Sequence, residues 1–359
     1  MTTPKLSDFT IPEFYRAMID RERMQVSRDE AKWAEAGEEP QRPVDVLLNF
    51  GCNVRQTPHL QREAVAVLEV LGVDFAAIAG QRTCCGKVYT GLGFPDMGAQ
   101  VINTSVKRMA AYTPKRTIQW CSACEMQFSD VFGSSESVSF TSEPLAAFLL
   151  ERIDALGDAV PWQQEVKVKA VVHGHLGEHA VRDRHPKIAA ELLNRIPGTE
   201  YVDYAETEVL DICDNQGLLI AAMDSAEYKA TQARLENYLA GSGADTLVTL
   251  YHSCTRELSK FVSDRLPIKH YISILAQALG VAKPDRFSEY WRMGDPVKVM
   301  EASRANWSSW GIPEQEAIRM AHKYFTPNYG ETLPDCPCGG TCSATGSDWL
   351  DIDERQADR

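Results

Sequence analysis

The feature that most constrains the fold is an order of predicted strands and helices that occurs twice. Short apolar runs that close on glycine alternate with amphipathic helical stretches from residue 44, and the same order returns from residue 166. "VDVLLNFG" (44–51) opens the first copy and "VKVKAVVHG" (166–174) opens the second. Because strands that alternate with helices favour parallel sheets with helical crossovers, the sequence predicts an α/β fold of two pseudo-repeated units.

The two copies divide the chain into four predicted segments. Charged, partly helical sequence precedes the first copy, and helical patterns followed by an irregular stretch come after the second. The predicted segments are an N-terminal extension (1–43), a first unit (44–155), a second unit (156–280) and a helical C-terminal extension with a cysteine-containing tail (281–359).

The composition predicts a soluble globular protein, since 44% of the 359 residues are apolar and 24% are charged. The formal net charge of −13 argues against nucleic acid or an anionic membrane surface as the main partner. No apolar run approaches the length of a membrane span, and the first residues lack the apolar core of a secretory signal. We therefore expect a cytoplasmic protein with no membrane span and no nucleic-acid partner.

Ten cysteines in such a chain indicate metal binding or redox chemistry, because the cytoplasm keeps thiols reduced. Five lie in the first unit, each just beyond the carboxyl end of a predicted strand: Cys52, Cys84, Cys85, Cys121 and Cys124. Loops at that end of a parallel sheet share one edge, so the five thiols are expected to converge. Thiolates are preferred ligands of iron–sulfur clusters and of structural zinc, and five exceed what one tetrahedral zinc uses. Thiols that only pack in the core are the third possibility.

The spacing of these cysteines resembles that of a known family. The vicinal pair Cys84-Cys85 precedes a glycine and stands between a single cysteine and a C-x-x-C motif. This pattern resembles the cysteine-rich CCG domain of the B-type subunit of heterodisulfide reductase and its relatives, over roughly residues 44–280 as a tandem pair of Rossmann-like CCG units. The resemblance implies that the five cysteines hold a non-cubane [4Fe-4S] cluster, with Cys84 and Cys85 at the reaction centre.

The second unit departs from the family pattern, which predicts a degenerate copy. Gly174, Asp214 and Tyr251 stand where cysteines are expected, and only Cys213 and Cys254 remain. A second cluster of the family type is therefore not expected, for want of soft ligands.

Three interpretations of the second unit stay open. One is a zinc site made by its cysteines and histidines, and another is a vestigial pocket in which these side chains pack and hydrogen-bond. The third brings in the cysteines of the tail, which would restore the thiol count to five. The residues concerned are Cys213, Cys254, His173, His175 and His252 in the unit, and Cys336, Cys338 and Cys342 in the tail.

Polar residues beside the first site also have two interpretations. Arg55 and His59 follow the first cysteine, and Lys87 with Tyr89 follow the vicinal pair. They either tune the cluster and hold a charged sulfur substrate, or they solvate surface loops. Trp120 similarly either shields the cluster from water or belongs to the ordinary core.

The resemblance implies an oxidoreductase subunit of a heterodisulfide-reductase-like complex, active only within that complex on thiol/disulfide or persulfide groups. The degenerate second unit and the long extensions look like the bacterial sulfur-oxidising type. The sequence has no ferredoxin cysteine run and no dinucleotide-binding glycine motif, so electrons must come through partners. The implied partners are a ferredoxin-like C-type subunit, a flavin-containing A-type subunit and a sulfur-carrier protein. The alternatives are a cluster subunit of a lactate, glycolate or succinate dehydrogenase complex and a non-catalytic assembly subunit braced by zinc or a cluster.

Overall fold

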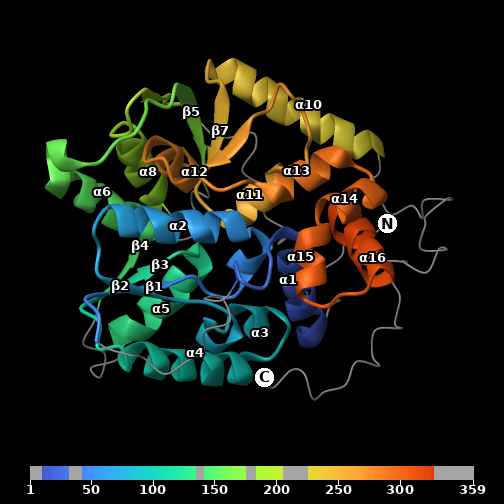
Figure 1. The fold of residues 1–359 in the computed structure, drawn as a ribbon. Helices are drawn as coiled ribbons and strands as arrows, with labels where there is room; N and C mark the ends of the chain where they lie inside the picture. Colours follow the sequence, from blue (N-terminus) through green and yellow to red (C-terminus); the bar gives the residue numbers. More distant parts are fainter. Residues whose placement is uncertain (1–9, 32–42, 135–140, 175–182, 205–224, 327–359) are drawn as a thin grey trace.

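The fold contains two parallel four-stranded sheets, one in each predicted unit (Figure 1). The structure, a computed structural model, describes residues 10–31, 43–134, 141–174, 183–204 and 225–326. The strands are β1 (Val46–Asn49), β2 (Phe75–Ile78), β3 (Arg116–Gln119) and β4 (Thr141–Pro144) in the first sheet, and β5 (Val168–His173), β6 (Thr199–Tyr201), β7 (Thr246–Thr249) and β8 (Ile268–His270) in the second. The predicted α/β class with parallel sheets is confirmed.

The two sheets have the same strand order. The first runs β2-β1-β3-β4 and the second β6-β5-β7-β8, and all neighbouring strands are parallel. Two of the four central strands, β1 and β7, are buried along their whole length. The edge strands β4 ("TSEP") and β8 ("IKH") lie outside the predicted pattern because they are short and polar.

Helices cover the sheets and make up both extensions. The units contain α2 (Pro58–Val70), α3 (Lys87–Gly91), α4 (Pro95–Ala110), α5 (Ser122–Ser134), α6 (Leu145–Leu156), α8 (His185–Leu193), α10 (Ser225–Ser242), α11 (His252–Leu258) and α12 (Tyr271–Ala278). The extensions contribute α1 (Ile11–Gln25), α13 (Arg286–Met293), α14 (Pro296–Ala302), α15 (Arg304–Ser309) and α16 (Glu314–Phe325). Over the described parts of the chain, every helix is too short or too polar to cross a bilayer.

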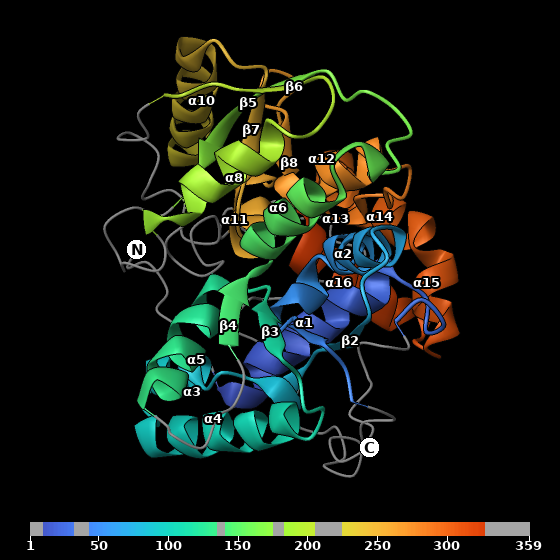
Figure 2. The same cartoon turned by 90° about the vertical axis from the view of Figure 1, so that its left-hand side faces the viewer.

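The two units meet at the carboxyl edges of their sheets. Figure 2 shows one unit above the other, with α6 and α2 near the level where they join. Leu48 and Phe50 of the first unit belong to the same buried apolar cluster as Val172 and Leu275 of the second. Trp120, directly after β3, stacks on the His270 ring at the end of β8, with the ring centroids 5.0 Å apart. The residues that follow the strands of both sheets therefore lie close together.

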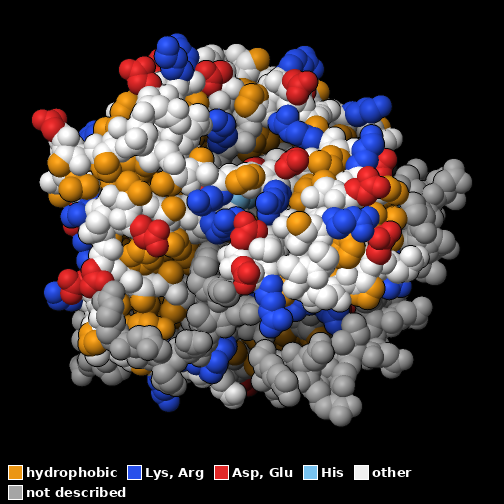
Figure 3. Space-filling view, viewed as in Figure 1, with side chains coloured by type: hydrophobic (Ala, Val, Ile, Leu, Met, Phe, Trp, Pro, Cys, Tyr) orange, Lys and Arg blue, Asp and Glu red, His pale blue; other side chains and the backbone are white. Residues whose placement is uncertain are grey.

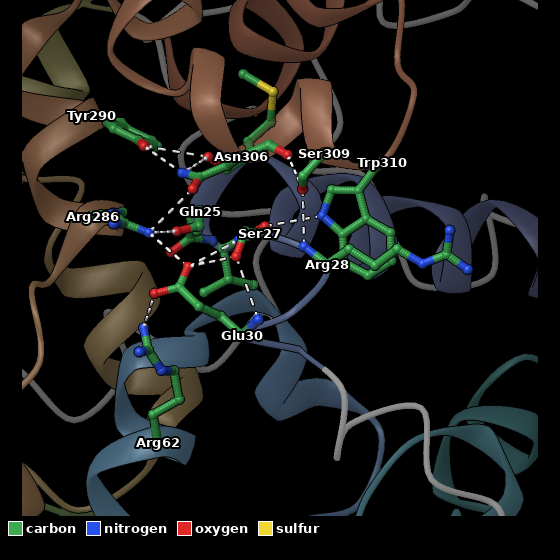
Figure 4. Close-up of polar contacts among 12 residues, drawn as sticks. Gln25, Ser27, Arg28, Glu30, Arg62, Arg286, Tyr290, Asn306, Ser309 and Trp310 are labelled. Atoms are coloured by element: carbon green, nitrogen blue, oxygen red, sulfur yellow. Dashed lines mark hydrogen bonds and ion pairs between the residues drawn. The ribbon is translucent and has the colours of Figure 1, made fainter.

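The two extensions pack on each other and form a second apolar cluster. The indole N–H of Trp310 donates to the carbonyl of Val26 at 2.9 Å, and the Asn306 amide donates to the carbonyl of Met24 at 3.0 Å. Figure 4 shows polar contacts of this region, including the ion pair between Glu30 and Arg62 of α2 at 2.8 Å. The end of α1 and the turn after it are therefore held against the C-terminal extension and, through Arg62, against the first unit.

Candidate functional site

The five predicted ligands lie together at the carboxyl edge of the first sheet. They follow β1, β2 and β3, which are neighbours in that sheet, so loops far apart in the sequence meet there. The residues are Cys52 after β1, Cys84 and Cys85 after β2, and Cys121 and Cys124 after β3.

The sulfur atoms of these cysteines form a continuous chain of contacts. The Sγ atoms of Cys52 and Cys84 are 4.0 Å apart. The thiols of Cys84 and Cys85 share a hydrogen bond, and Cys85 shares another with Cys124. Cys124 in turn hydrogen-bonds Cys121. The vicinal pair therefore joins a group that contains Cys52 to a group that contains the C-x-x-C motif.

At two positions near this edge, only a residue without a Cβ atom can be accommodated. Gly51 has a φ of +66°, and a Cβ atom added to it would lie 2.8 Å from the Sγ atom of Cys124. Gly86, directly after the vicinal pair, has a φ of +80°, and its Cβ would lie 2.4 Å from the carbonyl oxygen of Gly98 in α4. Both positions combine a left-handed backbone with a close neighbour, so only glycine fits.

Tyr15 of α1 reaches the same site from the N-terminal extension. Its hydroxyl donates to the Sγ atom of Cys84 at 3.5 Å, and the backbone N–H of Gly86 donates to that sulfur at 3.4 Å. Hydrogen bonds from Cys52 and Cys85, together with these two donors, lower the pKa of the Cys84 thiol to about 3. Burial raises the pKa of the Tyr15 hydroxyl, which therefore keeps the proton that it donates. Without a metal, the site favours a thiolate at Cys84.

The sulfurs differ in their access to solvent. Cys84, Cys85 and Cys124 are buried, whereas Cys52 and Cys121 are partly exposed. The two partly exposed cysteines are the two ends of the sulfur chain. Exposure to solvent is therefore greatest at the two ends of the sulfur chain, and the vicinal pair is buried.

The donor set fits an iron–sulfur cluster by its chemistry. Five soft thiols with no carboxylate among them are the ligands that such clusters use. Among the residues that the structure describes, no group of three or more His, Cys, Asp and Glu side chains is arranged to hold a single metal ion.

The corresponding edge of the second sheet is filled by packed side chains. A Cβ atom on Gly174, which follows β5, would lie 2.8 Å from Cγ of Pro186, so a larger side chain has no room there. Tyr251, which replaces the first cysteine of the C-x-x-C motif, is buried, and its hydroxyl lies 2.8 Å from Nδ1 of His185. These contacts favour the packed interpretation of this unit, while the zinc site stays a prediction.

Some of the predicted ligands of the second site are placed by the structure and others are not. Cys254, His173 and His252 are all buried. The predicted residues that lie outside the described residues are Cys213, His175, Cys336, Cys338 and Cys342.

Glu125, next to Cys124, joins the two units. Its carboxylate lies 2.8 Å from Nε2 of His185 and 2.8 Å from Nη2 of Arg184, and the side chain is buried. His185 in turn contacts Tyr251. The edge of the second sheet therefore supports α5, the helix that carries Cys124. No sequence pattern predicts this role, because a glutamate after a C-x-x-C motif has no fixed partner.

Arg256 of α11 places positive charge beside the first cysteine. Its Nη1 donates at 3.0 Å to the side-chain oxygen of Asn53, the residue after Cys52. Arg256 is buried together with Lys260 and Glu257, which are joined by an ion pair of 2.7 Å. Two cations and one carboxylate leave this buried group net positive, but the hydrogen bond with Cys84 and burial still raise the pKa of the Cys52 thiol. No motif in the sequence predicts the position of Arg256 either.

The polar residues predicted beside the first site have different environments. Arg55 donates from Nε to a buried glutamate of α1 at 2.7 Å, and so holds that helix in place. Lys87 is exposed, as expected for a surface loop. The Tyr89 ring lies 6.3 Å from the Tyr15 ring beside the vicinal pair. His59 lines a separate cleft, away from the five cysteines.

Two buried histidines of the second unit lie against Trp120, which is part of the shared core. The centroid of the His252 ring is 6.2 Å from that of Trp120. Burial and then the charge of Arg256 lower the pKa of His252 to about 3. Burial, followed by the neighbouring histidines, lowers the pKa of His270 well below its ordinary value. Both rings are therefore neutral in the folded protein near neutral pH.

We expect the folded protein to lose stability as the pH falls below about 6.5, where an unfolded histidine takes up its proton. His252 and His270 stay neutral in the fold at that pH, so the unfolded state binds more protons and acid favours it. Each group lowers the free energy of unfolding by about 1.4 kcal/mol per pH unit. Urea unfolding at pH 7.5, 6.0 and 5.0 measures this slope. The His252→Gln variant should have a shallower slope, and an equal slope in variant and parent would contradict the assignment.

The comparisons with known proteins agree with this site. Residues 46–129, which contain all five cysteines, match the CCG family, described as "Cysteine-rich domain". This part of the chain is therefore a CCG cysteine-rich domain. A domain of this class generally implies a cysteine-bound iron–sulfur cluster.

The chain is also distantly related to the D-type subunit of heterodisulfide reductases. It is 22% identical over 273 residues to that subunit of the dihydromethanophenazine:CoB–CoM heterodisulfide reductase of Methanosarcina barkeri, and 22% identical over 272 residues to that of Methanosarcina mazei. Each match covers 72% of this chain but only 65% and 64% of the respective relative, which is less than two thirds of its length. The relation to heterodisulfide reductases is confirmed, whereas the B-type and the sulfur-oxidising assignments stay predictions.

Among solved structures, a hypothetical protein from Helicobacter pylori is similar with a TM-score of 0.46 and 11% identity. The similarity covers 79% of this chain and 57% of that protein. A likeness of this size says nothing about function.

Proposed function

We propose that this chain is the iron–sulfur subunit of a heterodisulfide-reductase-like complex and that it carries a non-cubane [4Fe-4S] cluster. The proposed ligands are Cys52, Cys84, Cys85, Cys121 and Cys124. The observation that supports this most is the continuous chain of contacts among their five sulfurs. Two groups of sulfurs that meet at a vicinal pair suit a cluster fused from smaller iron–sulfur fragments.

The bound cluster would supply single electrons for thiol/disulfide or persulfide chemistry in sulfur metabolism. In the reductive direction, a disulfide takes up two electrons and two protons and yields two thiols. The electrons must enter or leave through other subunits, which we propose to be a flavin-containing A-type subunit and a ferredoxin-like C-type subunit. A sulfur-carrier protein is the proposed source of the sulfur substrate.

The chain's own residues would orient and protect this site. Tyr15 and Gly86 donate hydrogen bonds to the Cys84 sulfur and hold it in one orientation. Burial keeps water away from the vicinal pair, at which we place the reaction. Arg256, which donates to Asn53 beside Cys52, would offset part of the negative charge that a bound cluster and its thiolates bring together.

Electron paramagnetic resonance of the chain, purified without oxygen together with its native partners, tests this function. We expect an iron signal in the oxidised protein that changes when a small thiol is added and returns with the matching disulfide. The Cys254→Ser variant, which changes a cysteine outside the sulfur chain, should behave like the parent.

Two outcomes would contradict the proposal. A protein that contains zinc and gives no iron signal would favour a subunit that is only braced by metal. An iron signal that ignores thiols and disulfides would favour electron transfer without sulfur chemistry, as in the dehydrogenase complexes.

A further inference from the structure

A cleft of about 260 Å³ lies where the two units meet the C-terminal extension. Its walls come from α2, α11, β8, α12 and α13, and none of the five cysteines of the sulfur chain lines it. Figure 3 shows a hollow on this face, with histidine atoms inside it and Lys and Arg side chains around it. The proposed cluster site does not include this cleft.

The two carboxylates of the cleft are already engaged by donors of the protein. Glu63 accepts the backbone N–H of Lys283 at 3.0 Å and the hydroxyl of Ser273 at 2.6 Å, one with each oxygen. Asp285 caps α13, where it accepts the backbone N–H of Ser288 at 3.0 Å and the hydroxyl of that residue at 2.6 Å. These hydrogen bonds hold the two carboxylates in place as parts of the wall.

The remaining polar groups of the cleft are mostly donors. Lys269, Lys283 and Arg292 line it and bring three positive charges. Arg292 has a solvent-exposed aspartate as its ion-pair partner, at 3.7 Å, and such pairs are weak. Lys269 contacts an uncharged amide oxygen, at 3.4 Å.

Two buried polar groups of the cleft have no hydrogen-bond partner within the described chain. The hydroxyl of Ser259 has none, and Nδ1 of His59 is 3.5 Å from the nearest carboxylate oxygen, that of Asp285. Both side chains are more than nine-tenths buried. A buried polar group without a partner is costly, so a ligand with acceptor oxygens would be favoured at this position.

We propose that this cleft binds a small molecule through an anionic oxyacid group, that is, a carboxylate, a phosphate or a sulfur oxyanion. The three cations outnumber the two carboxylates of the wall and attract the negative charge, and the polar atoms of Ser259 and His59 can contact its oxygens. The volume of the cleft limits the ligand to a small metabolite. This site is separate from the proposed cluster, so it stands or falls independently of the redox function.

Calorimetric titration of the full-length chain with phosphate, sulfate and succinate, at one ionic strength set with chloride, tests the proposal and distinguishes the three sources. We expect saturable binding with a stoichiometry of one for at least one of the three anions. Arg292→Gln and Lys269→Gln should each weaken this binding about tenfold, the usual order for losing a charge-assisted contact. Lys298→Gln, an exposed lysine of α14 outside the cleft, should leave it unchanged.

The result that would overturn the proposal is equally specific. Either no saturable binding of any of the three anions, or binding that neither cleft variant weakens, excludes this cleft as an oxyanion site. Because Arg292 is about half exposed, its replacement should leave the fold intact, and a thermal melt of each variant verifies this.

Discussion

Replacing either Cys84 or Cys85 by serine should remove at least half of the iron bound by the chain, as a rough estimate from the loss of a soft ligand. A serine hydroxyl stays protonated at neutral pH and is a hard donor, so it is a poor substitute for a thiolate. These two sulfurs also join the two groups of the sulfur chain, so the loss of either one separates them. Iron and acid-labile sulfide per polypeptide, measured after purification without oxygen, give the result.

Cys254→Ser is the matched control for this experiment. Cys254 is as buried as Cys84, but it belongs to the second unit and does not contribute to the chain of five sulfurs. Its replacement should leave the iron content unchanged. Full iron content in the Cys84→Ser and Cys85→Ser variants would contradict the proposed ligand set.

Gly86→Ala should destabilise the first unit by about 3–4 kcal/mol, from left-handed backbone strain and overpacking together. The added Cβ would meet the carbonyl oxygen of Gly98 at 2.4 Å, far inside normal contact, at a φ of +80°. The vicinal pair lies directly before this glycine, so relief of the clash would move Cys84 and Cys85. Urea unfolding gives the loss of stability, and the iron content of the same preparation shows whether the site survives.

Gly93→Ala separates backbone strain from crowding. Gly93 also has a left-handed φ, +89°, but a Cβ atom there would have no neighbour within 4 Å. Its replacement should cost only about 1–2 kcal/mol, the strain alone. Equal losses in the two variants would show that the approach of Gly86 to α4 is unimportant.

Most of the fold could be predicted because the central strands and the longer helices have clear local patterns. The apolar runs of β1 and β7 and the helical pattern of α4 need no partner to be recognised. The strands β4 and β8 could not be found this way, because their residues are polar and only the neighbouring strand makes them extended.

Some residues of the candidate site could likewise be predicted from the sequence, and others could not. Cysteines at fixed spacing after successive strands carry a chemical signal of their own, and the structure brings all five together. Tyr15, Glu125 and Arg256 carry no such signal, since each reaches the site through the packing of another segment on the first unit. The sequence likewise does not predict that Pro186 packs against Gly174 at the carboxyl edge of the second sheet, because this is a tertiary contact.

X-ray absorption at the iron edge, on the full-length chain purified without oxygen, tests most directly whether the five cysteines hold one iron–sulfur cluster. We expect iron surrounded by sulfur with a second iron as a near neighbour, and the loss of this pattern in the Cys85→Ser variant. Iron without an iron neighbour, or the absence of an iron edge from the purified chain, would contradict the proposed cluster.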